Sequence, residues 1–150
     1  MLAVSLLALS TGCAYMVILH DPLTADEHND LGVVYESNGQ LDLAAREYRK
    51  AIRLEPRQAR ARVNLGNVEA AAGRWAKAER SYRLALRESP ADPDAMNNLA
   101  VALLRQGRGS IEARTLAERA VAAGTERDSV YRATLAEVEQ SLKPGSEARK

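Results

Sequence analysis

Residues 31–56 read LGVVYESNGQLDLAAREYRKAIRLEP, and residues 65–90 read LGNVEAAAGRWAKAERSYRLALRESP. The second stretch repeats the first after 34 positions, with matches at Leu31 and Leu65, Gly32 and Gly66, Gly39 and Gly73, Ala44 and Ala78, Tyr48 and Tyr82, and Pro56 and Pro90. Leu99 and Gly107 continue the same step into a third copy. A fixed period between about 20 and 50 residues indicates stacked units, each of which buries an apolar face on its neighbours.

Each unit has the pattern of two helices. Small or apolar residues fall on one face of a helix in both halves of the first unit: Leu31, Gly32 and Tyr35, then Ala44, Tyr48 and Ala51. Gly39 breaks the chain between the halves, and Pro56 ends the second helix near Leu54. Because Gly32 has no Cβ, the two helices can approach closely. The unit is therefore predicted to be a helix hairpin.

The composition favours an all-helical fold. The chain has 150 residues, and after residue 19 it contains 24 alanines and no phenylalanine, so its core must be built from small side chains. A β-sandwich is therefore not the expected fold. The formal net charge is only +1. Nucleic acid is therefore not expected as a partner, since proteins that neutralise phosphates carry a marked basic excess.

The residues that usually carry chemistry are few. A single cysteine, Cys13, cannot form an internal disulfide, and with only two histidines, His20 and His28, no Cys/His metal cluster can be assembled. Neither a glycine-rich phosphate loop nor a nucleophile with its base stands out. The sequence predicts no enzyme, no catalytic residues, no metal site and no cofactor.

The 34-residue step and the residues quoted above resemble the tetratricopeptide repeat family. The resemblance implies three helix hairpins in a right-handed superhelical stack, at residues 25–58, 59–92 and 93–124. The third hairpin is degenerate, because Ala113 comes one residue late. His28, Arg62 and Glu69 stand where the family usually has large apolar or aromatic residues. Residues 125–143 are predicted to form a C-terminal capping helix, and residues 144–150 a disordered tail.

In this family the first helix of each hairpin lines a concave groove that holds peptides. Carried over to this chain, the resemblance gives these candidate groove residues: Asn29, Asn64, Asn67, Asn97, Asn98, Arg60 and Arg105. A row of amides can hold the backbone of an extended peptide, because each amide offers donors and an acceptor. The alternative is that asparagine is simply a polar residue on a solvated face. Relatives that clamp a C-terminal carboxylate carry basic residues at the places of Asn29, Asp94 and Asn98, so that clamp is not predicted.

The N-terminus has the form of an export signal. Residues 1–19 contain no charged side chain, and an apolar run of about 7–15 residues followed by small residues is typical of a secretory signal. The run Leu9, Ser10, Thr11, Gly12, Cys13 resembles a bacterial lipobox. It implies a signal peptide at 1–12, a lipidated Cys13 and a tether at 13–24. The alternatives are an uncleaved membrane anchor at 1–19 and an ordinary buried thiol.

Together these observations predict a membrane-anchored tetratricopeptide-repeat lipoprotein of a bacterial cell envelope, facing the periplasm. Its expected role is that of a non-catalytic adaptor that binds a peptide segment of a protein partner and scaffolds an export or assembly complex. Two other roles stay open, an accessory subunit of an envelope processing peptidase and a self-associating module. The membrane is then a second partner, reached through the N-terminal lipid or anchor.

Overall fold

The computed structural model describes residues 21–143, which form seven α-helices and contain no strand. The predicted signal segment 1–12, the lipidation candidate Cys13 and the predicted tail 144–150 lie outside the described residues. The helices are α1 (Ala25–Ser37), α2 (Leu41–Leu54), α3 (Ala59–Ala71), α4 (Trp75–Glu88), α5 (Pro93–Arg105), α6 (Ile111–Ala122) and α7 (Asp128–Ser141). Between residues 21 and 143, none of the helices has both the length and the apolar character needed to cross a bilayer.

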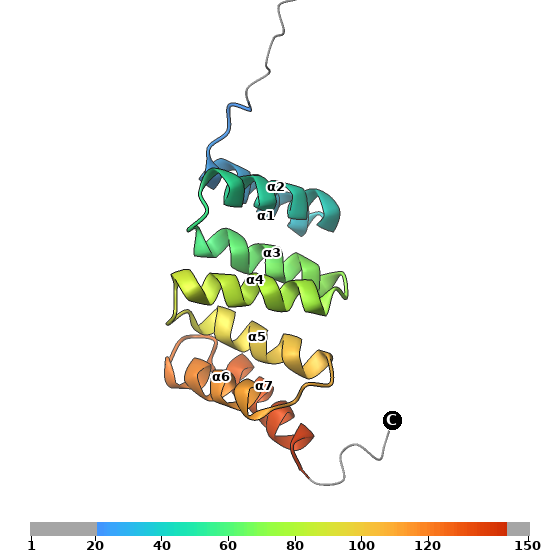
Figure 1. The fold of residues 1–150 in the computed structure, drawn as a ribbon, viewed down its shortest axis with the longest axis vertical. Helices are drawn as coiled ribbons and strands as arrows, with labels where there is room; N and C mark the ends of the chain where they lie inside the picture. The colour runs from blue at the N-terminus through green and yellow to red at the C-terminus, as the bar shows by residue number, and fades with distance from the viewer. Residues whose placement is uncertain (1–20, 144–150) are drawn as a thin grey trace, which may run out of the picture.

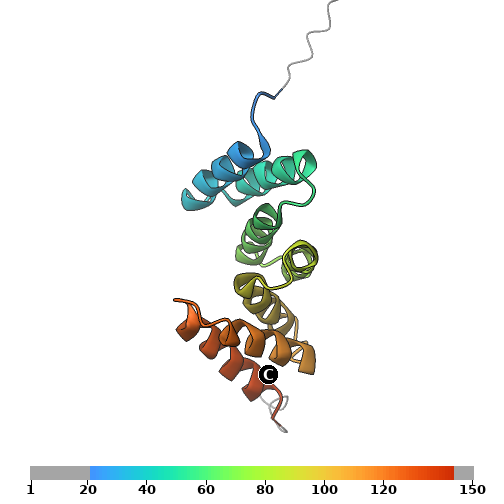
Figure 2. The same cartoon turned by 90° about the vertical axis from the view of Figure 1, so that its left-hand side faces the viewer.

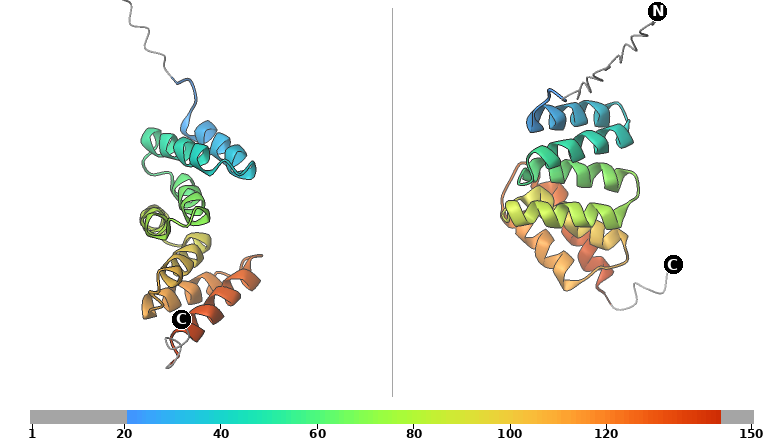
Figure 3. Two further views of the ribbon diagram at one scale, coloured as in Figure 1. Left: turned by 90° about the vertical axis from the view of Figure 1, so that its right-hand side faces the viewer. Right: turned by 45° about the horizontal axis from the view of Figure 1, so that its top comes forward.

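The helices stack in chain order, and each packs against the next (Figure 1). In Figure 2, α1, α3 and α5 lie on one side of the stack and α2 and α4 on the other. We call these sides the inner layer and the outer layer. The first and last helices, α1 and α7, lie at opposite ends of the stack (Figure 3). The predicted all-helical stack of three hairpins and a seventh helix is confirmed.

Glycines set the turns inside the hairpins. Gly39, Gly73 and Gly107 follow α1, α3 and α5 at φ values of 72°, 71° and 69°, in the left-handed region that side chains with a Cβ rarely enter. Each glycine therefore ends one helix and turns the chain towards its partner. The second helix of the first hairpin ends at Leu54, two residues before Pro56, as the sequence predicts.

Two other glycines let the paired helices approach. Gly32 of α1 lies against the ring of Tyr48 of α2, and Gly66 of α3 lies in the same way against Tyr82 of α4. A methyl group at Gly66 would stand 2.7 Å from Cδ1 and 2.8 Å from Cζ of Tyr82. The close approach predicted for Gly32 is therefore confirmed, and the tyrosine ring occupies the space over each glycine.

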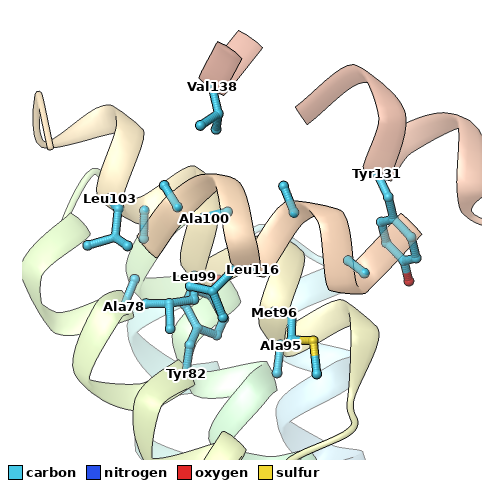
Figure 4. Close-up of a cluster of buried hydrophobic side chains, with 14 of the residues drawn as sticks. Ala78, Tyr82, Ala95, Met96, Leu99, Ala100, Leu103, Leu116, Tyr131 and Val138 are labelled. Atoms are coloured by element: carbon cyan, nitrogen blue, oxygen red, sulfur yellow. The ribbon is translucent and has the colours of Figure 1, made fainter. Parts of the chain in front are cut away.

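The buried side chains form two clusters of unequal size. The larger one runs from α3 to α7 and includes Tyr82, Leu99, Leu103, Tyr131 and Val138 (Figure 4). The smaller one joins the first hairpin to α3 through Ala44, Ala45, Tyr48 and Val68. Alanine supplies much of both clusters, as the composition predicts. Helix α7 packs on the larger cluster through Tyr131 and Val138, which are buried.

Two residues that depart from the family pattern are buried and paired with charges. His28 is packed inside the first hairpin, where its Nδ1 lies 2.8 Å from Oε2 of Glu47. Glu69 is only 2% exposed and receives hydrogen bonds from Arg49 of α2 and Arg74 in the α3–α4 turn. An ion-paired carboxylate thus joins consecutive hairpins at the position where the first hairpin has Tyr35.

A second charged group joins α4 to the third hairpin. Arg83 bonds to Glu79 and Glu112, and Arg108 donates to Glu79. The hydrogen bond from Arg83 lowers the pKa of Glu112. Burial tends to raise the pKa of Glu79, but bonds from Gln106, Arg83 and Arg108 outweigh it and lower that pKa as well.

These lowered pKa values predict sensitivity to acid. A carboxylate with a folded pKa below its unfolded value of 4.5 stabilises the fold above that pH, and the contribution is lost as the pH falls through the folded pKa. Melting temperatures should therefore change little from neutral pH down to about pH 5 and fall below about pH 4. Arg83→Gln should show a smaller acid-induced loss than the wild type. An equal loss in both proteins would contradict the assignment.

Candidate functional site

The inner layer carries a cleft between the second and third hairpins. Its volume is about 590 Å³, and it is lined by α3, the turn before α5, the first half of α5 and the residue before α7. Its polar lining consists of Arg60, Asn64, Asn67, Ser89, Asp92, Asp94, Asn98 and Arg127. Because these side chains come from consecutive hairpins, the stacking itself positions the cleft.

A smaller, mostly apolar hollow adjoins this cleft. It has a volume of about 260 Å³ and shares Asn67 and Asn98 with the first. Its remaining lining is small or apolar except for a tyrosine hydroxyl: Ala70, Ala71, Trp75, Tyr82 and Val101. The two hollows therefore present a polar surface beside an apolar one, with a pair of asparagines between them.

The structure separates the predicted asparagines into two groups. Asn64, Asn67 and Asn98 line the cleft, whereas Asn29 and Asn97 are only 1% and 3% exposed. Asn29 and Asn97 are therefore covered in this structure, and their contact with a ligand stays a prediction. Asn29 accepts a hydrogen bond from Asn64 of the next hairpin, whereas the amide of Asn97 donates to Asn98 of its own helix.

Hydrogen bonds between asparagines connect successive hairpins. Asn64 Nδ2 donates to Asn29 Oδ1 at 2.9 Å, and Asn98 Nδ2 donates to Asn67 Oδ1 at 3.0 Å. The Tyr82 hydroxyl donates to the same Asn67 oxygen at 3.0 Å. Burial raises the pKa of Tyr82, which keeps this hydroxyl protonated. These bonds hold the amides of the cleft in fixed positions.

Part of the hydrogen-bonding capacity of the cleft is unused. Within residues 21–143 the two N–H groups of Asn67 Nδ2 and the side-chain oxygen of Asn64 make no hydrogen bond. A peptide backbone needs both donors and acceptors from its receptor. Asn67 offers the donors and Asn64 offers the acceptor, on adjacent turns of the same helix.

The predicted arginines are held in ion pairs. Arg60 Nη2 lies 2.9 Å from Oδ1 of Asp30, and Arg105 Nη1 lies 2.7 Å from Oε1 of Glu137. All four side chains are well exposed, and exposed pairs of this kind contribute little to stability. Arg60 lines the cleft, but Arg105 does not.

The lining of the two hollows includes residues that the sequence did not predict, among them Arg127, Trp75 and Asp92. Arg127 closes one side of the cleft through an ion pair of 2.7 Å with Asp94. Trp75, at the start of α4, lines the apolar hollow. Asp92 is the N-cap of α5 and accepts a hydrogen bond from the amide of Ala95. The single tryptophan was the one signal available, while Arg127 and Asp92 lie outside the helices that the repeat pattern marks.

The arrangement supplies polar groups that can bind a ligand. Among residues 21–143, no three His, Cys, Asp or Glu side chains are grouped in a way that could hold a metal ion. The charges of the cleft balance, because Arg60 and Arg127 face Asp92 and Asp94. A ligand of the cleft is therefore expected to be polar along its length and close to neutral.

Comparison with solved structures identifies similar folds. The first tetratricopeptide repeat domain of Spaghetti (RPAP3), bound to the HSP90 peptide SRMEEVD, superposes with a TM-score of 0.73 at 20% identity and covers 79% of this chain and 93% of that one. The TPR2B domain of yeast Sti1, in a complex with an Hsp70 peptide, gives a TM-score of 0.73 at 17% identity, covering 77% and 96%. No curated protein sequence matches the chain.

Family models cover most of the described residues. Two models, both described as tetratricopeptide repeat, match residues 29–93 and 69–138. They overlap in the second hairpin and together cover residues 29–138, from within α1 to most of α7. With the repeat, the fold and the family models in agreement, the chain belongs to the tetratricopeptide repeat family.

Proposed function

We propose that this protein is a non-catalytic adaptor that holds an extended peptide segment of a protein partner in the cleft of its inner layer. The observation that carries the proposal is the pair of adjoining hollows, one lined by asparagines and one by apolar side chains. The peptide backbone would be held by Asn64 and Asn67, and one apolar side chain would enter the hollow beside Trp75 and Val101. Extended peptides are commonly recognised in this way, with hydrogen bonds to the backbone for affinity and pockets for side chains for specificity.

The second part of the proposal concerns the place of action. We infer from the apolar residues 1–19 and from Cys13 that the body is held at a bacterial membrane, facing the periplasm, by a lipid or by an uncleaved anchor. The adaptor would then keep its partner close to the membrane and serve as a scaffold for an export or assembly complex. Mass spectrometry of the intact protein from solubilised membranes would show whether Cys13 is acylated.

Peptide binding can be tested by removing the amides with unused capacity. Peptides are first selected on the wild-type chain from a displayed random library, and the dissociation constant of a selected peptide is then measured for each variant. Asn64→Ala with Asn67→Ala should weaken binding about tenfold or more, because two hydrogen bonds contribute about 1 kcal/mol each. Asn64→Ala alone, which leaves the Tyr82 hydroxyl paired, should give about half of that loss on a logarithmic scale.

The matched control is Asn38→Ala, in the exposed turn after α1. It removes the same amide far from the cleft and should leave the dissociation constant unchanged. Circular dichroism should show the same helical content for all variants. A selected peptide that binds the double variant as tightly as the wild type would show that the cleft is not the binding site.

A further inference from the structure

The second helices of the first two hairpins carry a repeated set of cations. Arginines occur at matching places 34 residues apart in α2 and α4: Arg46 and Arg80, Arg49 and Arg83, Arg53 and Arg87. Lys50 and Lys77 add one further cation to each helix. Each helix thus has four basic and two acidic side chains. The first helix of the stack, α1, has four acidic side chains and no lysine or arginine.

These cations face away from the core. Tyr48 and Tyr82 are buried near the middle of α2 and α4, and residues two positions before and five after them lie on the opposite side of a helix. Arg46, Arg53, Arg80 and Arg87 occupy those positions and are exposed. The outward side of the outer layer is therefore cationic over two consecutive hairpins.

Much of this charge is not neutralised within the molecule. Arg49 pairs with Glu69 of the next hairpin, and Arg83 pairs with Glu79 of its own helix and with Glu112 of the third hairpin. In the part of the chain that the structure describes, Arg53, Lys77, Arg80 and Arg87 form no ion pair. We call the outward side of α2 and α4 with these four residues the outer cationic face.

The N-terminal chain joins the fold at this same side. Asp21, the first described residue, accepts a hydrogen bond of 2.9 Å from Lys50 Nζ of α2, and its carboxylate also lies 3.4 Å from His28 Nε2. Lys50 lies next to Arg46 and Arg53 on the outward side of α2, one turn from each. The segment predicted to reach the membrane therefore enters the fold beside the cationic face.

We propose that the outer cationic face docks on the anionic lipid headgroups of the membrane to which the N-terminus is held. The inference rests on the membrane attachment in the proposed function. An anionic bilayer attracts each nearby lysine or arginine enough to raise affinity about fivefold, and a tether keeps those side chains at high local concentration. The long side chains of the outer cationic face can adapt to a surface of mobile headgroups. Docking through α2 and α4 also leaves the cleft of the inner layer open to a partner.

The test measures binding of the full chain to phosphatidylcholine vesicles and to vesicles that also contain phosphatidylglycerol. The outer variant combines Arg53→Gln, Arg80→Gln and Arg87→Gln, none of which breaks an ion pair. The control variant combines Arg60→Gln, Arg105→Gln and Arg127→Gln, which removes the same charge from the inner side. The outer variant should bind the phosphatidylglycerol vesicles about a hundredfold more weakly than the wild type, and the control variant within about threefold of it.

The vesicle pair separates docking from anchoring. Binding to phosphatidylcholine alone reports the apolar N-terminus and should be equal in all three proteins. The preference of the wild type for phosphatidylglycerol should largely disappear when salt rises from about 0.1 M to about 1 M, because the Debye length falls from about 10 Å to about 3 Å.

Either of two results would overturn the proposal. Equal losses in the outer and control variants would show a general effect of net charge. The absence of any wild-type preference for phosphatidylglycerol would assign the face to another partner, such as an acidic protein. A further result separates the two proposals. If none of the three proteins binds phosphatidylcholine vesicles but only the outer variant loses the preference for phosphatidylglycerol, the docking face is supported and the predicted anchor is contradicted.

Discussion

Replacing Arg49 and Arg74 together by alanine should lower the free energy of unfolding by about 4 kcal/mol, because Glu69 would be left buried without a cation. Glu69 is 2% exposed, and Arg49 and Arg74 are its hydrogen-bond partners. Without these two arginines, a buried carboxylate lies between the first and second hairpins with no cation beside it. Chemical denaturation followed by circular dichroism measures the loss, provided the unfolding transition stays cooperative.

Two further variants identify the buried carboxylate as the cause. Adding Glu69→Leu to the double variant should restore most of the lost stability, since Leu103 occupies the matching place in the third hairpin. Arg53→Ala with Arg80→Ala removes two exposed arginines without ion pairs and should change stability by less than about 1 kcal/mol. A small loss in Arg49→Ala with Arg74→Ala, or no recovery with Glu69→Leu, would contradict the explanation.

Gly66→Ala should destabilise the fold by about 3 kcal/mol, an unusually large effect for one added methyl group. The new Cβ would meet the ring of Tyr82, which is 2% exposed and packed within the larger cluster. Neither the ring nor the backbone of α3 can move without separating the two helices. Thermal and chemical unfolding of the purified variant measure the effect.

The matched control is the same substitution seven residues later. Gly73→Ala meets no atom within 4 Å, but Gly73 has a φ of 71°. That variant should lose only about 1 kcal/mol, from backbone strain, and Gly73→Asn should lose less because asparagine tolerates the left-handed region. Equal losses at Gly66 and Gly73 would show that the contact with Tyr82 is not the dominant cause.

The fold could be predicted because its signals are local. Gly39 and Gly73 mark turns by their conformational freedom, and Pro56 stops a helix wherever it occurs. The delay of Ala113 by one residue also has a local explanation. The turn before α6, at residues 106–110, is longer than the turn at 72–74, and Ala113 is still buried.

The cleft could be predicted only in part, because it depends on contacts between hairpins. The repeat pattern placed Asn64, Asn67 and Asn98 on the first helices, and they line the cleft. It could not show that Asn29 is covered by the next hairpin, which happens because Asn64, 35 residues later, donates a hydrogen bond to it. It also could not pair Arg60 with Asp30, since both lie on exposed helix faces with many alternatives.

The unequal sizes of the two buried clusters have a consequence for the order in which parts of the chain open. In a stack whose units touch only their neighbours, folding can start in any unit and spread along the stack, and the units that bury the most apolar surface open last. The larger cluster, with Leu99, Leu103 and Tyr131, runs from α3 to α7, whereas the buried apolar residues of the first hairpin are Tyr48 and a few alanines. We expect the first hairpin to open before the part of the stack from α3 to α7.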